Sequence, residues 1–103
     1  MPPPLTIRVS PLAERDLEGI GDYIARDSAK IALNFIIALR ETFGKIAANP
    51  LACRERPELG KEVRSCAHGN YVIFFKATAR QIVIARVLHG AMDLPAQFAG
   101  DDK

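Results

Sequence analysis

Cysteine, long apolar runs and the short motifs of common enzyme sites are all scarce in this sequence. Its two cysteines, Cys53 and Cys66, are too few for a disulfide framework and have no second pair or histidine spacing suited to zinc. We therefore expect no metal and two buried or half-buried thiols. The chain also lacks a Gly-rich phosphate loop, paired histidine ligands and a serine nucleophile motif. The signals of catalysis are weak.

Charged residues interrupt every apolar stretch, so no window approaches the ~18 apolar residues of a membrane helix. Met1 to Leu5 lacks the basic and apolar regions of a signal peptide. We expect a cytoplasmic protein without membrane contact. With 103 residues, of which 49% are hydrophobic and 25% charged, the chain matches one ordinary globular domain spanning residues 1–103.

Positive charge is concentrated in the second half of the chain. Between Arg54 and Met92, seven basic residues accompany three acidic ones, whereas residues 1–50 are balanced. Such a surplus can steer association with an anionic surface. The sequence pI of about 8.7 lies below that of a dedicated nucleic-acid binder. An acidic protein surface fits this charge equally well, and direct nucleic acid is not the expected partner.

A strand and a helix are predicted near the start of the chain. Leu5, Ile7 and Val9 alternate with polar residues, which is typical of a strand with one buried face. The pair Ser10–Pro11 favours a helix start, because serine caps free amides and proline gives up an amide that has no partner there. The helix is expected to run to Arg26. Its apolar stripe consists of Ala13, Leu17, Ile20 and Ile24.

A second amphipathic helix is predicted after a short break. Asp27 or Ser28 can cap it, and Asn49 and Pro50 end it. Two helices joined by so short a connection lie antiparallel, and their stripes pack on a common surface. The stripe is too short for a coiled coil. It consists of Ala32, Phe35, Ile36, Leu39, Phe43 and Ile46.

The rest of the chain predicts a connector, three strands and a terminal turn. Residues 51–60 are rich in proline and charge, so we expect an exposed loop that carries Arg54 and Arg56 into solvent. A three-stranded antiparallel meander follows, and then a short C-terminal helical turn from Asp93 to Phe98. The predicted fold class is therefore α+β. The strands span Glu62 to Ala67, Tyr71 to Ala77 and Gln81 to His89.

The two central strands are apolar on both faces. Residues 71–75 and 82–85 form almost unbroken apolar runs, which is typical of strands covered on both sides. The helices can cover one face only. The segment from Gly90 onward is short, so we expect a partner to cover the other face.

Four sequence segments occur in the same order as in a known protein family. They are SPLAERDLEGIGDYIA (Ser10 to Ala25), RPELG (Arg56 to Gly60), GNYVIFF (Gly69 to Phe75) and RVLHGAMDLP (Arg86 to Pro95). With the order of strand, helical hairpin and meander, they resemble a ParE toxin of the RelE/ParE superfamily. The likeness spans roughly Thr6 to Phe98. Met92 stands where the family usually has an arginine.

The resemblance implies a toxin of a bacterial type II toxin–antitoxin system, of the kind that stabilises plasmids. Such a toxin inhibits DNA gyrase without being an enzyme, needs no cofactor, and is neutralised by a ParD-like antitoxin. The candidate target-binding residues are Arg64, Lys76, Arg86, His89, Asp93, Leu94 and Phe98. The candidate antitoxin-binding residues are Tyr23, Arg54, Arg56, Tyr71 and Phe74.

Arg86 lies inside a predicted strand, where a charge is costly unless it has a partner. We expect its side chain to face solvent or a binding partner. The alternative is an internal ion pair with Glu62 or Asp93.

Two other functions stay open. A ribosome-dependent mRNA endonuclease of the RelE type needs a base, an acid and cations, which Arg64, Lys76, Arg86 and His89 can supply in part. However, residues 92–103 contain no Tyr, His or Arg, one of which the tail of that branch typically has. The other alternative is an inert module that only binds its antitoxin, because Met92 replaces a cation.

Overall fold

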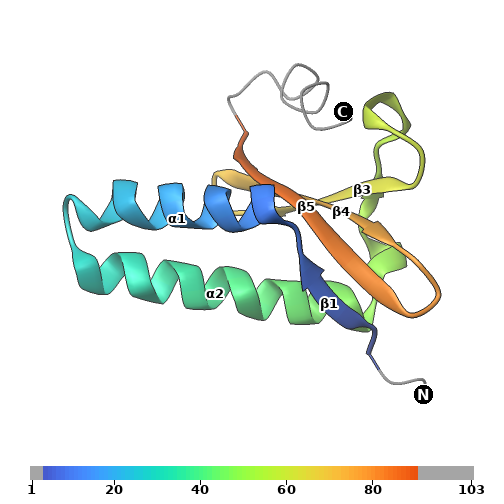
Figure 1. Cartoon of the computed structure of the whole chain (residues 1–103), viewed down its shortest axis with the longest axis horizontal. Helices are drawn as coiled ribbons and strands as arrows, with labels where there is room; N and C mark the ends of the chain where they lie inside the picture. The colour runs from blue at the N-terminus through green and yellow to red at the C-terminus, as the bar shows by residue number, and fades with distance from the viewer. Residues whose placement is uncertain (1–3, 91–103) are drawn as a thin grey trace.

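The computed structural model describes residues 4–90, in which two antiparallel helices pack on one face of a five-stranded sheet (Figure 1). The α+β fold class is confirmed. The predicted C-terminal turn and the site candidates Asp93, Leu94 and Phe98 lie outside the described residues. No helix within residues 4–90 has the length and apolarity needed to cross a membrane.

The sheet combines the meander with two further strands, in the order β1-β5-β4-β3-β2. Strand β1 is parallel to β5, and the other neighbours are antiparallel. Two short 3-10 helices, η1 and η2, flank β2. The elements are β1 (Thr6–Val9), α1 (Pro11–Ala25), α2 (Ala29–Ala48), η1 (Pro50–Ala52), β2 (Arg54–Glu55), η2 (Pro57–Leu59), β3 (Val63–His68), β4 (Tyr71–Ala77) and β5 (Gln81–His89).

Serine caps begin both helices. The Oγ of Ser10 accepts a hydrogen bond from the amide of Ala13 at 3.1 Å, and the Oγ of Ser28 accepts one from Ile31 at 3.2 Å. Each bond satisfies an amide that has no partner inside the helix. Ser28 is thus the residue that caps α2. The loop between the helices lies far from the sheet (Figure 1).

The main core lies between the helices and the sheet, and it confirms the predicted stripes. Ile24, Phe35 and Ile36 are partly buried at its margin. Because apolar side chains recur every three or four residues in the helices and every two in the strands, both layers present continuous faces to each other. This helix-side core contains Ala13, Leu17, Ile20, Leu39, Phe43, Ile46, Ala47, Ile73, Phe75, Ile82, Ile84 and Val87.

The opposite face of the sheet holds a second buried cluster, formed by Leu59, Val63, Phe74 and Leu88, none of which is more than 5% exposed. The prediction that a partner must cover this face is therefore wrong for these side chains. Phe74, an antitoxin-binding candidate, is completely buried. It is a core residue here and offers no surface to a partner.

The connector explains part of this cover, because it is mostly exposed, as predicted, but not throughout. Arg54 is exposed as expected, but β2 pairs with β3, and η2 brings Leu59 into the second cluster. The guanidinium carbon of Arg56 lies 5.6 Å from the centre of the Phe74 ring. A guanidinium at this distance from an aromatic ring is attracted to its face.

Strand β5 is divided by an irregularity into a proximal half, Gln81–Ile84, and a distal half, Ala85–His89. Opposite β4, Phe75 faces Ile84 while its neighbour Phe74 faces Arg86, so Ala85 is an extra residue. A bulge of this kind shifts the alternation of side chains by one step. It allows both Ile84 and Val87 to enter the helix-side core.

Candidate interaction groove at the end of strand β5

An ion pair between α1 and β5 stands at the centre of the candidate site. Arg86 donates from Nε to one carboxylate oxygen of Asp16 at 2.8 Å and from a terminal nitrogen to the other at 3.0 Å. Both side chains are only 12% exposed. Two parallel charge-assisted bonds hold the guanidinium in a fixed orientation. The expectation that Arg86 faces solvent is wrong, since the side chain is largely buried in an internal pair.

The same carboxylate helps to close the edge of the sheet. Strand β1 pairs only with the proximal half of β5 and then turns into α1. Beyond this point the amide of Val87 donates to Asp16 at 2.9 Å, and the Oγ of Ser10 donates to the carbonyl of Ala85 at 2.9 Å. Backbone groups at an edge need such partners when they are shielded from water. Helix α1 therefore replaces a strand along the distal half.

A groove of about 310 Å³ lies beside this ion pair and brings together candidates from both predicted sets. It is lined by Tyr23, Tyr71, Arg86 and His89, among others, and a neighbouring hollow shares Tyr23, Tyr71 and His89. The side chain of Tyr23 is 66% exposed. Exposed aromatic side chains beside a groove are typical of protein-binding surfaces.

The aromatic residues of the groove support one another. The rings of Tyr71 and His89 meet edge to face at 5.3 Å between centroids, and Phe35 of α2 lies 5.6 Å from Tyr71. The guanidinium of Arg26 lies 5.9 Å from the Tyr23 ring. These contacts restrict the orientations of the rings before binding. The side chains therefore lose less conformational entropy when a partner binds.

The remaining basic candidates do not join this groove. Lys76 is exposed and faces Val83 near the other end of β4, whereas His89 faces Tyr71. Five residue steps along a strand correspond to about 17 Å. Arg64 lies on β3 and donates to the carbonyl of Cys53 at 2.8 Å. Arg64, Lys76 and His89 therefore do not form one catalytic cluster.

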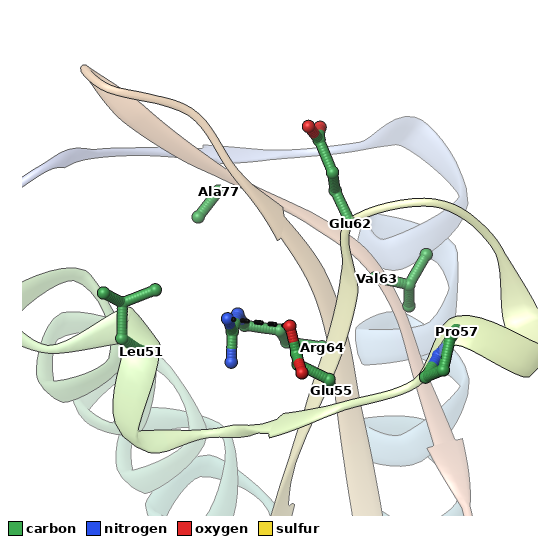
Figure 2. Close-up of a pocket in the computed structure, with 7 residues that line it drawn as sticks. All are labelled: Leu51, Glu55, Pro57, Glu62, Val63, Arg64 and Ala77. Carbon is green, nitrogen blue, oxygen red and sulfur yellow. Dashed lines mark hydrogen bonds and ion pairs between the residues drawn. The ribbon is translucent and has the colours of Figure 1, made fainter.

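Arg64 instead lines a separate cavity of about 260 Å³ (Figure 2). Its guanidinium lies 3.4 Å from the carboxylate of Glu55, while Leu51 and Ala77 lie on the other side of the cavity and Glu62 points away (Figure 2). The charge of Arg64 is thus partly balanced by its own neighbours. This cavity has less to offer an anionic partner than the charge count of the sequence suggests.

A family model described as the ParE toxin of the parDE type II toxin–antitoxin system matches residues 7–94. The chain belongs to the ParE toxin family. It is a toxin of a type II toxin–antitoxin system, as the sequence resemblance implied. A search of the curated proteins gave no match.

Two solved structures are similar to this ParE-family chain. One, from the chromosomal ParDE toxin–antitoxin system of P. aeruginosa, has 19% identity and a TM-score of 0.70, over 82% of this chain and 95% of that chain. The other, from the RelBE2 toxin–antitoxin complex of Mycobacterium tuberculosis, has 27% identity and a TM-score of 0.63, over 84% of this chain and 99% of that chain. They confirm the fold of the ParE/RelE superfamily.

Asp16 lines the groove and holds Arg86, and it was missed by sequence reasoning. It lies 70 positions before Arg86 in the sequence. The periodicity of α1 indicated that Asp16 is not part of the apolar stripe, but it did not indicate which residue Asp16 contacts. The available signal was the charge inside the predicted strand, which requires a carboxylate partner. Glu62, one of the two acids considered, is exposed and precedes β3 near Lys76. Asp93, the other, lies outside the described residues.

Arg56 in the connector also forms an ion pair, with the exposed carboxylate of Glu58. Arg56 donates from Nε to Glu58 at 2.7 Å, and this hydrogen bond lowers the pKa of the Glu58 carboxyl. A second bond joins Arg56 to the hydroxyl of Ser65.

Within residues 4–90, no group of three side chains is arranged to hold a metal ion.

Proposed function

We propose that this toxin inhibits DNA gyrase and that a ParD-like antitoxin neutralises it. The observation that carries the proposal is the match of the ParE family model over residues 7–94. The two similar structures come from a ParDE system and a RelBE2 toxin–antitoxin complex, which supports an antitoxin as a partner. Action on gyrase goes with a cytoplasmic location and with a role in plasmid stabilisation.

The arrangement of basic residues favours a binding mode of action over RNA cleavage. An endonuclease must bring a base, an acid and phosphate-binding cations within a few ångströms of one phosphodiester. Here Lys76 and His89 lie near opposite ends of β4, and Arg86 is engaged by Asp16. The second face of the sheet is lined by apolar residues next to Phe74. These features support a toxin that acts without catalysis.

We infer that the groove beside β5 is the contact surface for both macromolecules. It unites Tyr23 and Tyr71, which were antitoxin candidates, with His89, which was a target candidate. Two partners that need the same aromatic surface cannot occupy it together. The antitoxin then neutralises the toxin by covering the surface that gyrase requires.

Activity assays with the purified toxin distinguish the three functions. Inhibition of gyrase supercoiling, with filamentation and DNA-damage induction when the gene is expressed, supports the proposal. Cleavage of messenger RNA on ribosomes supports the RelE-type enzyme instead. Normal growth without either activity supports an inert antitoxin-binding module.

The groove assignment is tested with Tyr23→Ala. Truncation of an exposed aromatic contact is expected to weaken both gyrase inhibition and antitoxin binding by about tenfold or more, as at other interface hot spots. Leu51→Ala is the matched control, since Leu51 is 73% exposed and lies beside the cavity of Figure 2, away from the groove. The assignment fails if Tyr23→Ala and Leu51→Ala behave alike while both keep the circular dichroism of the native toxin.

A further inference from the structure

Cys53 directly precedes strand β2, and Cys66 lies on the neighbouring strand β3. Strand β2 runs antiparallel to β3, and its register can be followed back by one residue. Cys53 then stands directly opposite Cys66. The pairs that establish this register are Arg54 with Ser65 and Glu55 with Arg64.

The type of this cross-strand position favours a disulfide. The amide of Arg56 donates to the carbonyl of Val63 at 2.8 Å, which is the bond direction of a hydrogen-bonded position in the antiparallel ladder. Because hydrogen-bonded and non-hydrogen-bonded pairs alternate, Cys53 and Cys66 form a non-hydrogen-bonded pair, with Cα atoms about 4.5 Å apart. Disulfides form at Cα separations of about 4.4–6.8 Å. Neither strand has to shift for a bond to form.

The two side chains also point to the same side and meet. Both are half-buried free thiols that pack against the helix-side core. The side chain of Cys66 also contributes to the raised pKa of the Cys53 thiol, as expected for two neighbouring thiols. The backbone at Cys53 is fixed in addition by Arg64, which donates to its carbonyl at 2.8 Å.

We propose that Cys53 and Cys66 are a redox-active pair that closes into an intramolecular disulfide and locks edge strand β2 onto β3. With hydrogen peroxide as oxidant, one thiolate attacks the O–O bond, and the departing hydroxide takes up a proton to form water. The resulting sulfenic acid is attacked by the second thiol. The S–S bond forms, the S–O bond breaks, and the leaving oxygen departs as a second water. Two thiols thereby lose two electrons, which one peroxide accepts.

The disulfide acts on a weakly held part of the sheet. Strand β2 has only two residues, yet the segment that follows it brings Arg56 and Leu59 to the second face. Burial raises the pKa of the Cys53 thiol to about 11, with a further contribution from Cys66 and an opposing one from Arg64. The thiolate of Cys53 is therefore scarce at neutral pH, which slows the attack of this thiol on an oxidant.

Thiol counting on the purified full-length chain tests the pair. After treatment with peroxide the chain is unfolded, alkylated with a maleimide and weighed by mass spectrometry. The native chain is expected to lose both reactive thiols together and to stay monomeric. In glutathione buffers, the ratio of reduced to oxidised glutathione at which half of the chains carry the disulfide should be at least tenfold higher for the native chain than for the chain in urea. The reason is that folding holds the two thiols together. Equal ratios, covalent dimers or two persistent thiols overturn the proposal.

Cys53→Ser and Cys66→Ser are the matched controls. Each retains one thiol and should form no intramolecular product. Oxidation should raise the melting temperature of the unmodified chain by on the order of 10 °C and slow hydrogen exchange at the Arg56 amide, with neither change in the serine variants. An unchanged melting temperature counts against the lock. These readouts involve neither gyrase nor antitoxin, so their failure is separate from failure of the proposed function.

Discussion

Strand β5 is held in two different ways along its length. Its proximal half, Gln81–Ile84, pairs through backbone bonds with β1 on one side and β4 on the other. Its distal half also pairs with β4, but no described strand lies on its other side, where the N-cap residue Ser10 and Asp16 of α1 supply the partners. Backbone pairing tolerates most side chains, whereas on the side away from β4 the distal half depends on two particular residues, Ser10 and Asp16. The groove lies beside the distal half, which needs these particular side chains.

Removal of the Asp16 carboxylate, which holds the distal half, should cause the largest loss of stability. Asp16→Ala leaves Arg86 as a buried charge without this carboxylate and removes the acceptor of the Val87 amide, so we expect a loss of about 3–5 kcal/mol in unfolding free energy. Urea denaturation measures the loss. Native-state hydrogen exchange should speed up at Val87 more than at Ile82–Ile84.

Glu14→Ala is the control for the Asp16 substitution. Glu14 pairs with Arg40 at 3.3 Å, but both side chains are about half exposed. Such a pair contributes roughly 0–1 kcal/mol. If the two alanine variants lose equal stability, the distal half is not held by Asp16 in the way described.

Truncation in the proximal half tests the packing that accompanies backbone pairing. Ile82 is completely buried in the helix-side core, so Ile82→Ala should cost about 2–5 kcal/mol. The Asp16 contacts stay in place, and exchange should rise across the whole sheet rather than at Val87 alone. Ile7→Ala on the paired strand β1 is the comparison, because Ile7 is 43% exposed and should cost much less. A rise in hydrogen exchange in Ile82→Ala that is confined to Val87 would contradict the distinction between the proximal and distal halves of β5.

The smallest effect is expected from the two serine caps. Ser10 both caps α1 and donates to Ala85, whereas Ser28 only caps α2. Ser10→Ala should therefore cost about 1–2 kcal/mol and Ser28→Ala about 0.5–1 kcal/mol in thermal or urea unfolding. Equal losses would show that the bond from Ser10 to β5 adds nothing to the distal half.

Local patterns predicted most of the secondary structure. Strands β4 and β5 have the predicted bounds, and α1 and α2 end within a residue of theirs. Strand β2 was missed because two residues next to Pro57 carry no periodic signal. The cover of the second face was missed for the same reason, since Leu59 lies in a connector and not in a periodic stripe.

The candidate site was predicted in part. Tyr23, Tyr71, Arg86 and His89 were named and do line one groove. Arg64 and Lys76 were placed with them because they share a charge, but charge alone does not indicate which strand end a residue occupies. Phe74 was named as an antitoxin contact, but its side chain is buried in the second cluster.

By itself the sequence determined where the two helices and strands β4 and β5 begin, which helix faces are buried and which family the chain resembles, because capping and periodicity act between residues a few positions apart. Only the tertiary structure decided that β1 lies parallel to β5, that Asp16 holds Arg86 and that the register of β2 and β3 sets Cys53 opposite Cys66. Residues far apart in the chain meet only after the order and register of the strands are set. That order results from the packing of all the layers together.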